Sequence, residues 1–148
     1  MDAQPLGLIG RTGDDGGLVA AWEFAPDLRS PGRARAAARS TLERWRVQDP
    51  ADIDDVVLMV DELVANAVVH GSGPVRVRLS VRGLMLRAEI TDGSPDRPPE
   101  PPREGRPLDA EGGRGLFLVA ILSSQTGTEP CGAGKSVWFT RLLTGSAP

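Results

Sequence analysis

The chain has 148 residues, of which 40% are hydrophobic and 25% charged, a balance typical of one globular domain. Its net charge of −3 argues against bulk affinity for nucleic acid. A single cysteine, Cys131, excludes a disulfide within the chain and favours a reducing compartment, the cytoplasm. We expect no signal peptide and no membrane span, because neither an apolar signal core nor a run of about 20 apolar residues is present.

The N-terminal part of the chain predicts a tail, a strand and a helix. Residues 1–17 carry five glycines without periodicity, which indicates a flexible tail. An apolar run over residues 18–24 predicts a strand. Ser30 is the expected N-cap of a helix over residues 32–47, with Pro31 at its first position. Five arginines lie on the outer face of this helix, either as a solvated surface or as a docking face for an acidic partner.

The run of residues 54–70 is mainly apolar and contains no glycine or proline, which predicts one long, largely buried helix. Glu62, Asn66 and His70 interrupt it at intervals of four, and this spacing puts them on one helical face. Burying such groups is costly unless each is paired or coordinates a ligand. The polar line is therefore a candidate site, in which His70 is expected to be a helix-end residue or a packing partner.

A hairpin follows this helix. Residues 75–82 alternate strictly between apolar and polar, which predicts a half-buried strand with its arginines facing water. Gly83 begins a tight turn, and residues 84–92 return as a second strand. That strand ends on Asp92, whose carboxylate is then available at a strand end.

A proline- and glycine-rich segment, residues 93–115, follows the hairpin. Its six prolines and five glycines exclude a helix or a central strand and predict a functional loop such as a lid. The segment ends on Gly113-Arg114-Gly115 and feeds an apolar helix over residues 116–122. A glycine-rich helix start presents free backbone N–H groups and a positive dipole end, which suit phosphate. Arg114 is either a charge stabiliser for transferred phosphate or an exposed lid residue.

The last part of the chain is expected to form a loop and one strand. The loop follows Gly127 and contains Pro130 and Gly132, and the strand covers residues 135–142. Lys135, the only lysine in the chain, either contacts phosphate or lies on the surface.

These pieces together describe a magnesium–nucleotide pocket without a P-loop. The Asn66 carboxamide oxygen is a hard ligand, suited to Mg²⁺ that is held mainly by phosphates and water. Glu62, one turn away, could orient or deprotonate a nucleophile. Asp92 could accept hydrogen bonds from an amino group, and the helix start at Gly113 and Gly115 could hold phosphates.

This set of motifs resembles the GHKL, or Bergerat-fold, ATPase superfamily, and within it the small anti-sigma-factor serine kinases. The matching motifs, in chain order, are Glu62-x-x-x-Asn66-Ala67-x-x-His70, Asp92-Gly93, Gly113-Arg114-Gly115-Leu116 and Lys135-Ser136-Val137-Trp138. The resemblance implies an α+β two-layer sandwich, with a mixed, mostly antiparallel sheet covered on one face by helices. It places a single ATP-binding domain over residues 18–143, with the lid at 94–115 and a C-terminal tail at 144–148.

The resemblance also implies roles for individual residues. Glu62 would be the catalytic base, Asn66 the Mg²⁺ ligand, and Asp92 the acceptor for the adenine amino group. Ser136 would lie near the adenine end and help to hold Asp92 and a water. The remaining implied nucleotide-binding positions are Gly93, Gly113, Arg114, Gly115, Leu116 and Lys135.

The activity implied is a Mg-ATP-dependent protein-serine/threonine kinase. It would phosphorylate an antagonist protein of the anti-anti-sigma kind and sequester a partner such as a sigma factor. The resemblance implies a cytoplasmic bacterial regulator that engages neither nucleic acid nor membrane and is compatible with a homodimer.

One departure keeps an alternative open. The family's Asp-x-Gly-x-Gly pattern is here Asp92-Gly93-Ser94-Pro95-Asp96, so both later glycines are absent. The alternative is a nucleotide-binding module that does not turn over. A detached sensor-kinase catalytic domain fits less well, because it predicts an upstream phosphoacceptor histidine and His70 is the only histidine.

Overall fold

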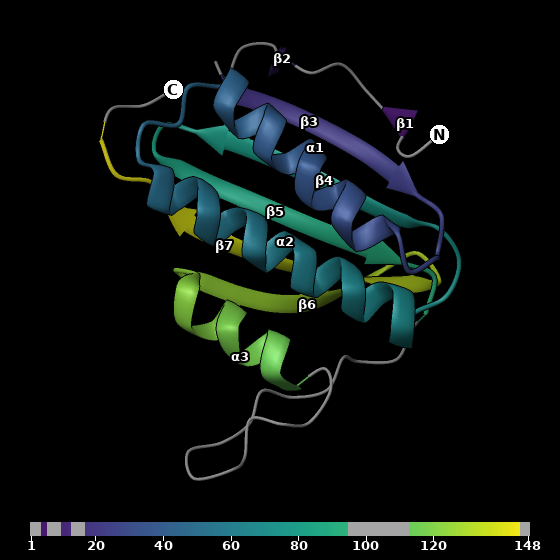
Figure 1. Ribbon diagram of the computed structural model, residues 1–148. Coiled ribbons are helices and arrows are strands. Elements are labelled where there is room, and N and C mark those ends of the chain that lie inside the picture. The colour runs from purple at the N-terminus through teal and green to yellow at the C-terminus, as the bar shows by residue number, and fades with distance from the viewer. Residues whose placement is uncertain (1–3, 6–9, 13–16, 95–112, 146–148) are drawn as a thin grey trace, which may run out of the picture.

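The computed structural model describes residues 4–5, 10–12, 17–94 and 113–145. Figure 1 shows two layers, an antiparallel sheet and the helices that cover one of its faces. The helices are α1 (Ser30–Arg44), α2 (Pro50–His70) and α3 (Gly113–Leu122). The longer strands are β3 (Gly17–Phe24), β4 (Val75–Arg82), β5 (Met85–Asp92), β6 (Gln125–Cys131) and β7 (Gly134–Leu142).

The sheet runs in the order β1-β3-β4-β5-β7-β6, and β2 also pairs with β3. The predicted α+β sandwich with helices on one face is confirmed. Every strand pairing within the described segments is antiparallel, so the mixed sheet that was expected is antiparallel there.

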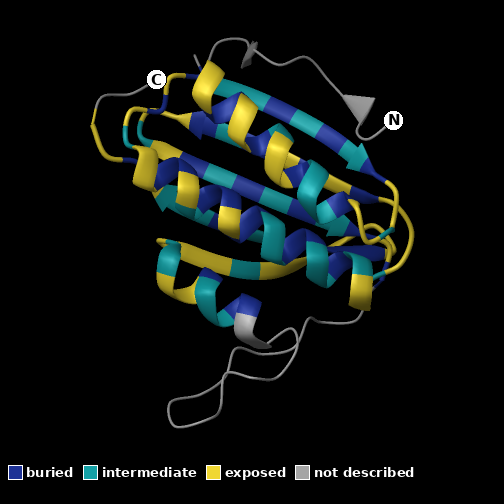
Figure 2. Ribbon diagram, in the orientation of Figure 1, coloured by how far each residue is buried: buried dark blue, intermediate teal, exposed yellow. Residues whose placement is uncertain are grey.

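The core lies between α2 and the inner face of the sheet. Along β4, Val75, Val77, Leu79 and Val81 are buried while the polar residues between them are not, as the alternation predicted. The buried face of α2 consists of Asp52, Ile53, Val56, Val57, Met59, Val60, Leu63, Val64 and Ala67. Figure 2 shows buried and exposed positions alternating along α2, as expected of a helix with one face against the sheet.

The N-terminal segment contains structure where only a flexible tail was predicted. Its described residues form β1 (Gln4–Pro5) and β2 (Gly10–Thr12), which pair with opposite ends of β3. Two- and three-residue strands carry too little pattern to be recognised in a glycine-rich sequence.

The strand β6 replaces the predicted loop after Gly127. It pairs with β7 along its whole length, including Pro130 opposite Lys135. Most of its side chains are exposed, so the sequence shows no apolar alternation. A proline is tolerated because, among the described strands, β6 has a neighbour on one side only.

Two helix starts differ in how they are capped. Ser30 was predicted to cap α1, but its hydroxyl instead donates to the Ala25 carbonyl oxygen, and the N-cap position is Arg29, which makes no side-chain capping bond. Asp49 caps α2, since its carboxylate accepts from the Ala51 N–H at 2.9 Å.

The C-terminal end of the domain is fixed to the start of α2. The Thr144 amide donates to buried Asp52, and the Thr144 hydroxyl contacts both Asp49 and Asp52. Arg141 binds Asp52 at 3.0 Å and Asp55 at 2.8 Å. Thr144, the first residue of the predicted C-terminal tail, is therefore held against the start of α2.

Among the helices in the described part of the chain, none is both long enough and apolar enough to cross a membrane.

Candidate functional site

The carboxylate of Asp92 is buried at the end of β5 and paired with Lys135. The Lys135 Nζ lies 3.0 Å from Oδ2 and 3.1 Å from Oδ1, and the two side chains are 7% and 2% exposed. The Ser94 amide donates to Oδ1 at 2.7 Å. Because Asp92 and Lys135 are cross-strand partners, the register of β5 and β7 brings the two charges together.

Two glycines let backbone approach Asp92 closely. A Cβ on Gly71 would lie 2.6 Å from the Asp92 Cγ, and a Cβ on Gly134 would overlap the Asp92 carbonyl oxygen. The Gly93 amide donates to the Ser72 carbonyl at 2.8 Å, which ties the turn after Asp92 to the end of α2. Gly93 was among the predicted site residues, whereas Gly71 was not.

Glu62 lies against the first turn of α3. A Cβ on Gly115 would come within 2.6 Å of the Glu62 Oε2. The neighbouring Asp61 faces away and pairs with Arg35 of α1 at 3.2 Å. The carboxylate at position 62 is therefore the one that faces the start of α3.

Asn66 lies one turn after Glu62 and has an unpartnered buried atom. Its Nδ2 is inaccessible to solvent and makes no hydrogen bond within the described chain. Buried amide atoms without a partner are uncommon and call for a ligand or a water. His70, one turn further, is exposed at the helix end, as expected of a helix-end residue.

The helix α2 connects the two ends of the site. Glu62 and Gly71 are nine residues apart, a rise of about 13 Å along an α-helix. Glu62 contacts the start of α3, whereas Gly71 contacts Asp92. An elongated ligand could therefore lie along the C-terminal half of α2, with Asn66 between its ends.

Ser136 lies apart from Asp92, contrary to the role implied by the resemblance. It is in register with Thr91, and side chains alternate along a strand, so Ser136 and Lys135 project from opposite faces. Its Oγ is buried and has no partner among the described residues. Lys135 takes the place beside Asp92, and its 5% exposure excludes the surface lysine considered above.

The other predicted site residues fall at the start of α3 or outside the described chain. Gly113 and Arg114 are the first two residues of that helix, one turn earlier than predicted, and Leu116 is buried in the core. The predicted lid falls on residues 95–112, which lie outside the described residues.

The arginines of α1 were expected to form either a solvated surface or a docking face for an acidic partner. Arg35 pairs with Asp61 and Arg39 pairs with Asp54, so these two join α1 to α2. Arg44 donates to Ser40 of its own helix. These contacts favour the reading of a solvated surface for this part of the helix.

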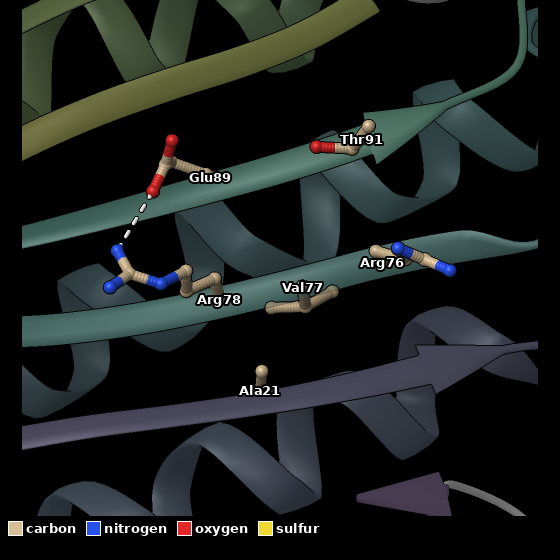
Figure 3. A pocket seen from close by; sticks show the side chains of 6 residues that line it. All are labelled: Ala21, Arg76, Val77, Arg78, Glu89 and Thr91. Atoms are coloured by element: carbon tan, nitrogen blue, oxygen red, sulfur yellow. Dashed lines mark hydrogen bonds and ion pairs between the residues drawn. The ribbon is translucent and has the colours of Figure 1, made fainter. Parts of the chain in front are cut away.

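A shallow groove lies on the face of the sheet that the helices leave uncovered (Figure 3). An ion pair between Arg78 and Glu89, at 3.1 Å, crosses it. Nearby, the Arg87 guanidinium stacks over Trp138 at 4.5 Å from the ring centroid. Strand alternation places Glu89 and Asp92 on opposite faces, so this groove is separate from the site along α2.

Comparison with known proteins decides the family. The model of the histidine kinase-like ATPase domain matches residues 24–141. The chain belongs to this family. Membership confirms the resemblance to the GHKL superfamily, and an ATPase family implies ATP binding.

The histidine kinase-like fold is also found in a solved structure, the RsbU and RsbW domains of Rv1364c from Mycobacterium tuberculosis. The TM-score is 0.63 at 21% sequence identity, over 86% of the present chain. The match covers 33% of that chain, so the present protein spans about a third of its length. Among curated proteins, none matches the chain.

Proposed function

We propose that this protein binds Mg-ATP along α2, transfers the γ-phosphate to a serine or threonine of an antagonist protein, and sequesters a partner. The observation that carries the proposal is the contact between Glu62 and Gly115, which sets a carboxylate against a helix N-terminus. Such a terminus attracts phosphate through its free N–H groups and dipole. A carboxylate beside it is suited to accept a proton from a hydroxyl that attacks phosphorus.

Asn66 is proposed to hold the magnesium ion. Its unpartnered buried amide fits this role, because the amide nitrogen and oxygen can exchange places and an amide oxygen is a ligand that Mg²⁺ accepts. When bound, the ion supplies charge neutralisation to the phosphates. The protein's own part is positioning, since Asn66 and Glu62 project from the same rigid helix.

Asp92 is proposed to accept a hydrogen bond from the adenine amino group. Lys135 and the Ser94 amide already fix the orientation of its carboxylate. A preorganised acceptor needs no rearrangement when the base arrives.

The proposed partners are an antagonist protein and a sigma factor in the cytoplasm of a bacterium. This part of the proposal rests on the resemblance of the four motifs to anti-sigma-factor kinases. The solved structure that shares the fold contains RsbU and RsbW domains, which is compatible with a regulatory role here.

The activity is tested by incubating the protein with Mg-ATP and candidate antagonist proteins and measuring phosphoserine and phosphothreonine. Glu62→Gln should reduce transfer by about 10²–10⁴-fold, the usual contribution of a general base. Asp61→Asn is the matched control, because it changes the adjacent carboxylate that pairs with Arg35. Transfer that is unaffected by Glu62→Gln would rule out the role of this residue.

A second candidate function is nucleotide-controlled partner binding without turnover. It is favoured by the turn after Asp92, where Ser94 replaces a glycine and the carboxylate is already enclosed. Tight ATP binding with no phosphate transfer to any partner, in wild type and Glu62→Gln alike, would support this candidate over the kinase.

A further inference from the structure

The ammonium group of Lys135 faces three acceptors around Asp92. Nζ lies 3.0 Å from Oδ2, 3.1 Å from Oδ1 and 3.4 Å from the Ser94 carbonyl oxygen. Both side chains are almost fully buried, so water does not compete for these contacts. The protein itself therefore sets the direction in which the Asp92 carboxylate faces.

The two oxygens of that carboxylate are not equivalent. Oδ1 accepts from both the Ser94 amide and Lys135, whereas Oδ2 accepts from Lys135 alone among the described residues. A carboxylate oxygen has about two acceptor directions. Oδ2 therefore keeps one for a ligand, on the side where Gly71 contributes no side chain.

We propose that Lys135 is a specificity-determining residue for the nucleobase. It holds Asp92 as a charged acceptor with one oxygen left over, so that the site selects a base that carries a hydrogen-bond donor, such as the amino group of adenine. A base with a carbonyl oxygen at the same position is rejected, because two acceptors then face each other. This inference rests on the proposed function, since it assumes that Asp92 contacts the base.

The inference is tested by calorimetric titration with ATP and with inosine triphosphate, which carries a carbonyl oxygen where adenine carries its amino group. Wild type should bind ATP about tenfold or more tightly than inosine triphosphate, because only ATP donates a hydrogen bond to the buried, charged Asp92. In Lys135→Met, the affinities for ATP and for inosine triphosphate should differ by no more than about threefold. The control, Arg141→Met, breaks ion pairs to Asp52 and Asp55 at the other end of the domain and should keep the wild-type preference.

A second pair of variants keeps the test decisive if Lys135→Met does not fold. In Asp92→Asn the amide oxygen should take the Oδ1 position, where Lys135 and the Ser94 amide both donate. The amide nitrogen then takes the Oδ2 position, so the Lys135 ammonium must turn away from it toward the Oδ1 position and the Ser94 carbonyl oxygen. With a donor at the Oδ2 position, the preference should invert toward inosine triphosphate. In the double variant with Lys135→Met, which buries no unpaired charge, only the Ser94 amide still directs the asparagine oxygen, so the inversion should be weaker.

The outcomes separate the two proposals. If wild type binds neither nucleotide, the nucleotide site itself is refuted. If wild type binds ATP and the preference is the same with and without Lys135, only the role of Lys135 is refuted. Loss of preference in Arg141→Met to the same extent as in Lys135→Met also refutes it, because a general loosening of the domain then explains the change.

Discussion

The Oε2 atom of Glu62 lies so close to Gly115 that a single added carbon at position 115 would come within 2.6 Å of it. This relationship joins the middle of α2 to the first turn of α3 and places the proposed base at the proposed phosphate site. The contact is possible only because position 115 has no side chain.

Gly115→Ala should weaken ATP binding by at least about tenfold, since Glu62 must move away from its position beside α3. Isothermal titration measures the effect. The control is Gly32→Ala in α1, where the nearest atom to the new Cβ lies at 3.6 Å. That substitution should leave binding unchanged and stabilise the helix by up to about 1 kcal/mol.

Gly71→Ala should disturb the other end of the site. The added methyl group would meet the Asp92 carboxylate at 2.6 Å and the Ala67 carbonyl oxygen at 2.5 Å. We expect a loss of about 1–3 kcal/mol in the free energy of unfolding in urea, together with weaker ATP binding. Ser72→Ala is the control, because residue 72 bonds Gly93 through its backbone carbonyl. Equal stability of the two variants would contradict the close packing at Gly71.

The sequence predicted the parts of this arrangement that depend on local pattern. The apolar run of α2, the alternation of β4 and the carboxylates at positions 62 and 92 were all recognisable. The strand β6 was missed because an exposed edge strand containing Pro130 shows neither alternation nor high strand propensity.

The neighbours of Asp92 were harder to predict. Lys135 contacts Asp92 from 43 residues away, through the register of two strands. Ser136 was the residue expected beside Asp92. It lies one residue after Lys135 on β7, so its side chain projects from the opposite face of the sheet. Gly71 and Gly134 allow their backbone to lie against Asp92, a contact that only the three-dimensional arrangement reveals.

Asp52→Asn should destabilise the fold without reaching the site. Asp52 is 1% exposed and holds both Arg141 and Thr144. Removing one charge of a buried, hydrogen-bonded pair costs about 3–5 kcal/mol in the free energy of unfolding, so urea denaturation should detect it readily. The comparison variant Arg39→Ala breaks an exposed pair with Asp54 and should cost about 1 kcal/mol or less.

Asp49 should make stability depend on pH in the acid range. The Ala51 backbone N–H chiefly, and then the Thr144 hydroxyl, hold the pKa of Asp49 below its ordinary value of 3.8. Because its pKa is lower in the folded than in the unfolded state, its stabilising contribution is complete above pH 3.8 and is lost as the pH falls through the folded value.

The variant Asp49→Asn isolates this charge, since asparagine caps a helix about as well as aspartate. In thermal unfolding, the Tm of wild type should be higher than that of the variant near neutral pH. This difference in Tm should shrink as the pH falls below 3.8. A difference in Tm that is constant over this range would contradict the assignment.

The central claim is that the C-terminal half of α2 faces the phosphates and magnesium of bound ATP, and calorimetric titration with ATP, with and without Mg²⁺, tests it most directly. Wild type should bind ATP more tightly when Mg²⁺ is present, and Asn66→Ala should lose that dependence. Failure of wild type to bind at millimolar ATP, or an undiminished Mg²⁺ dependence in Asn66→Ala, would contradict the claim.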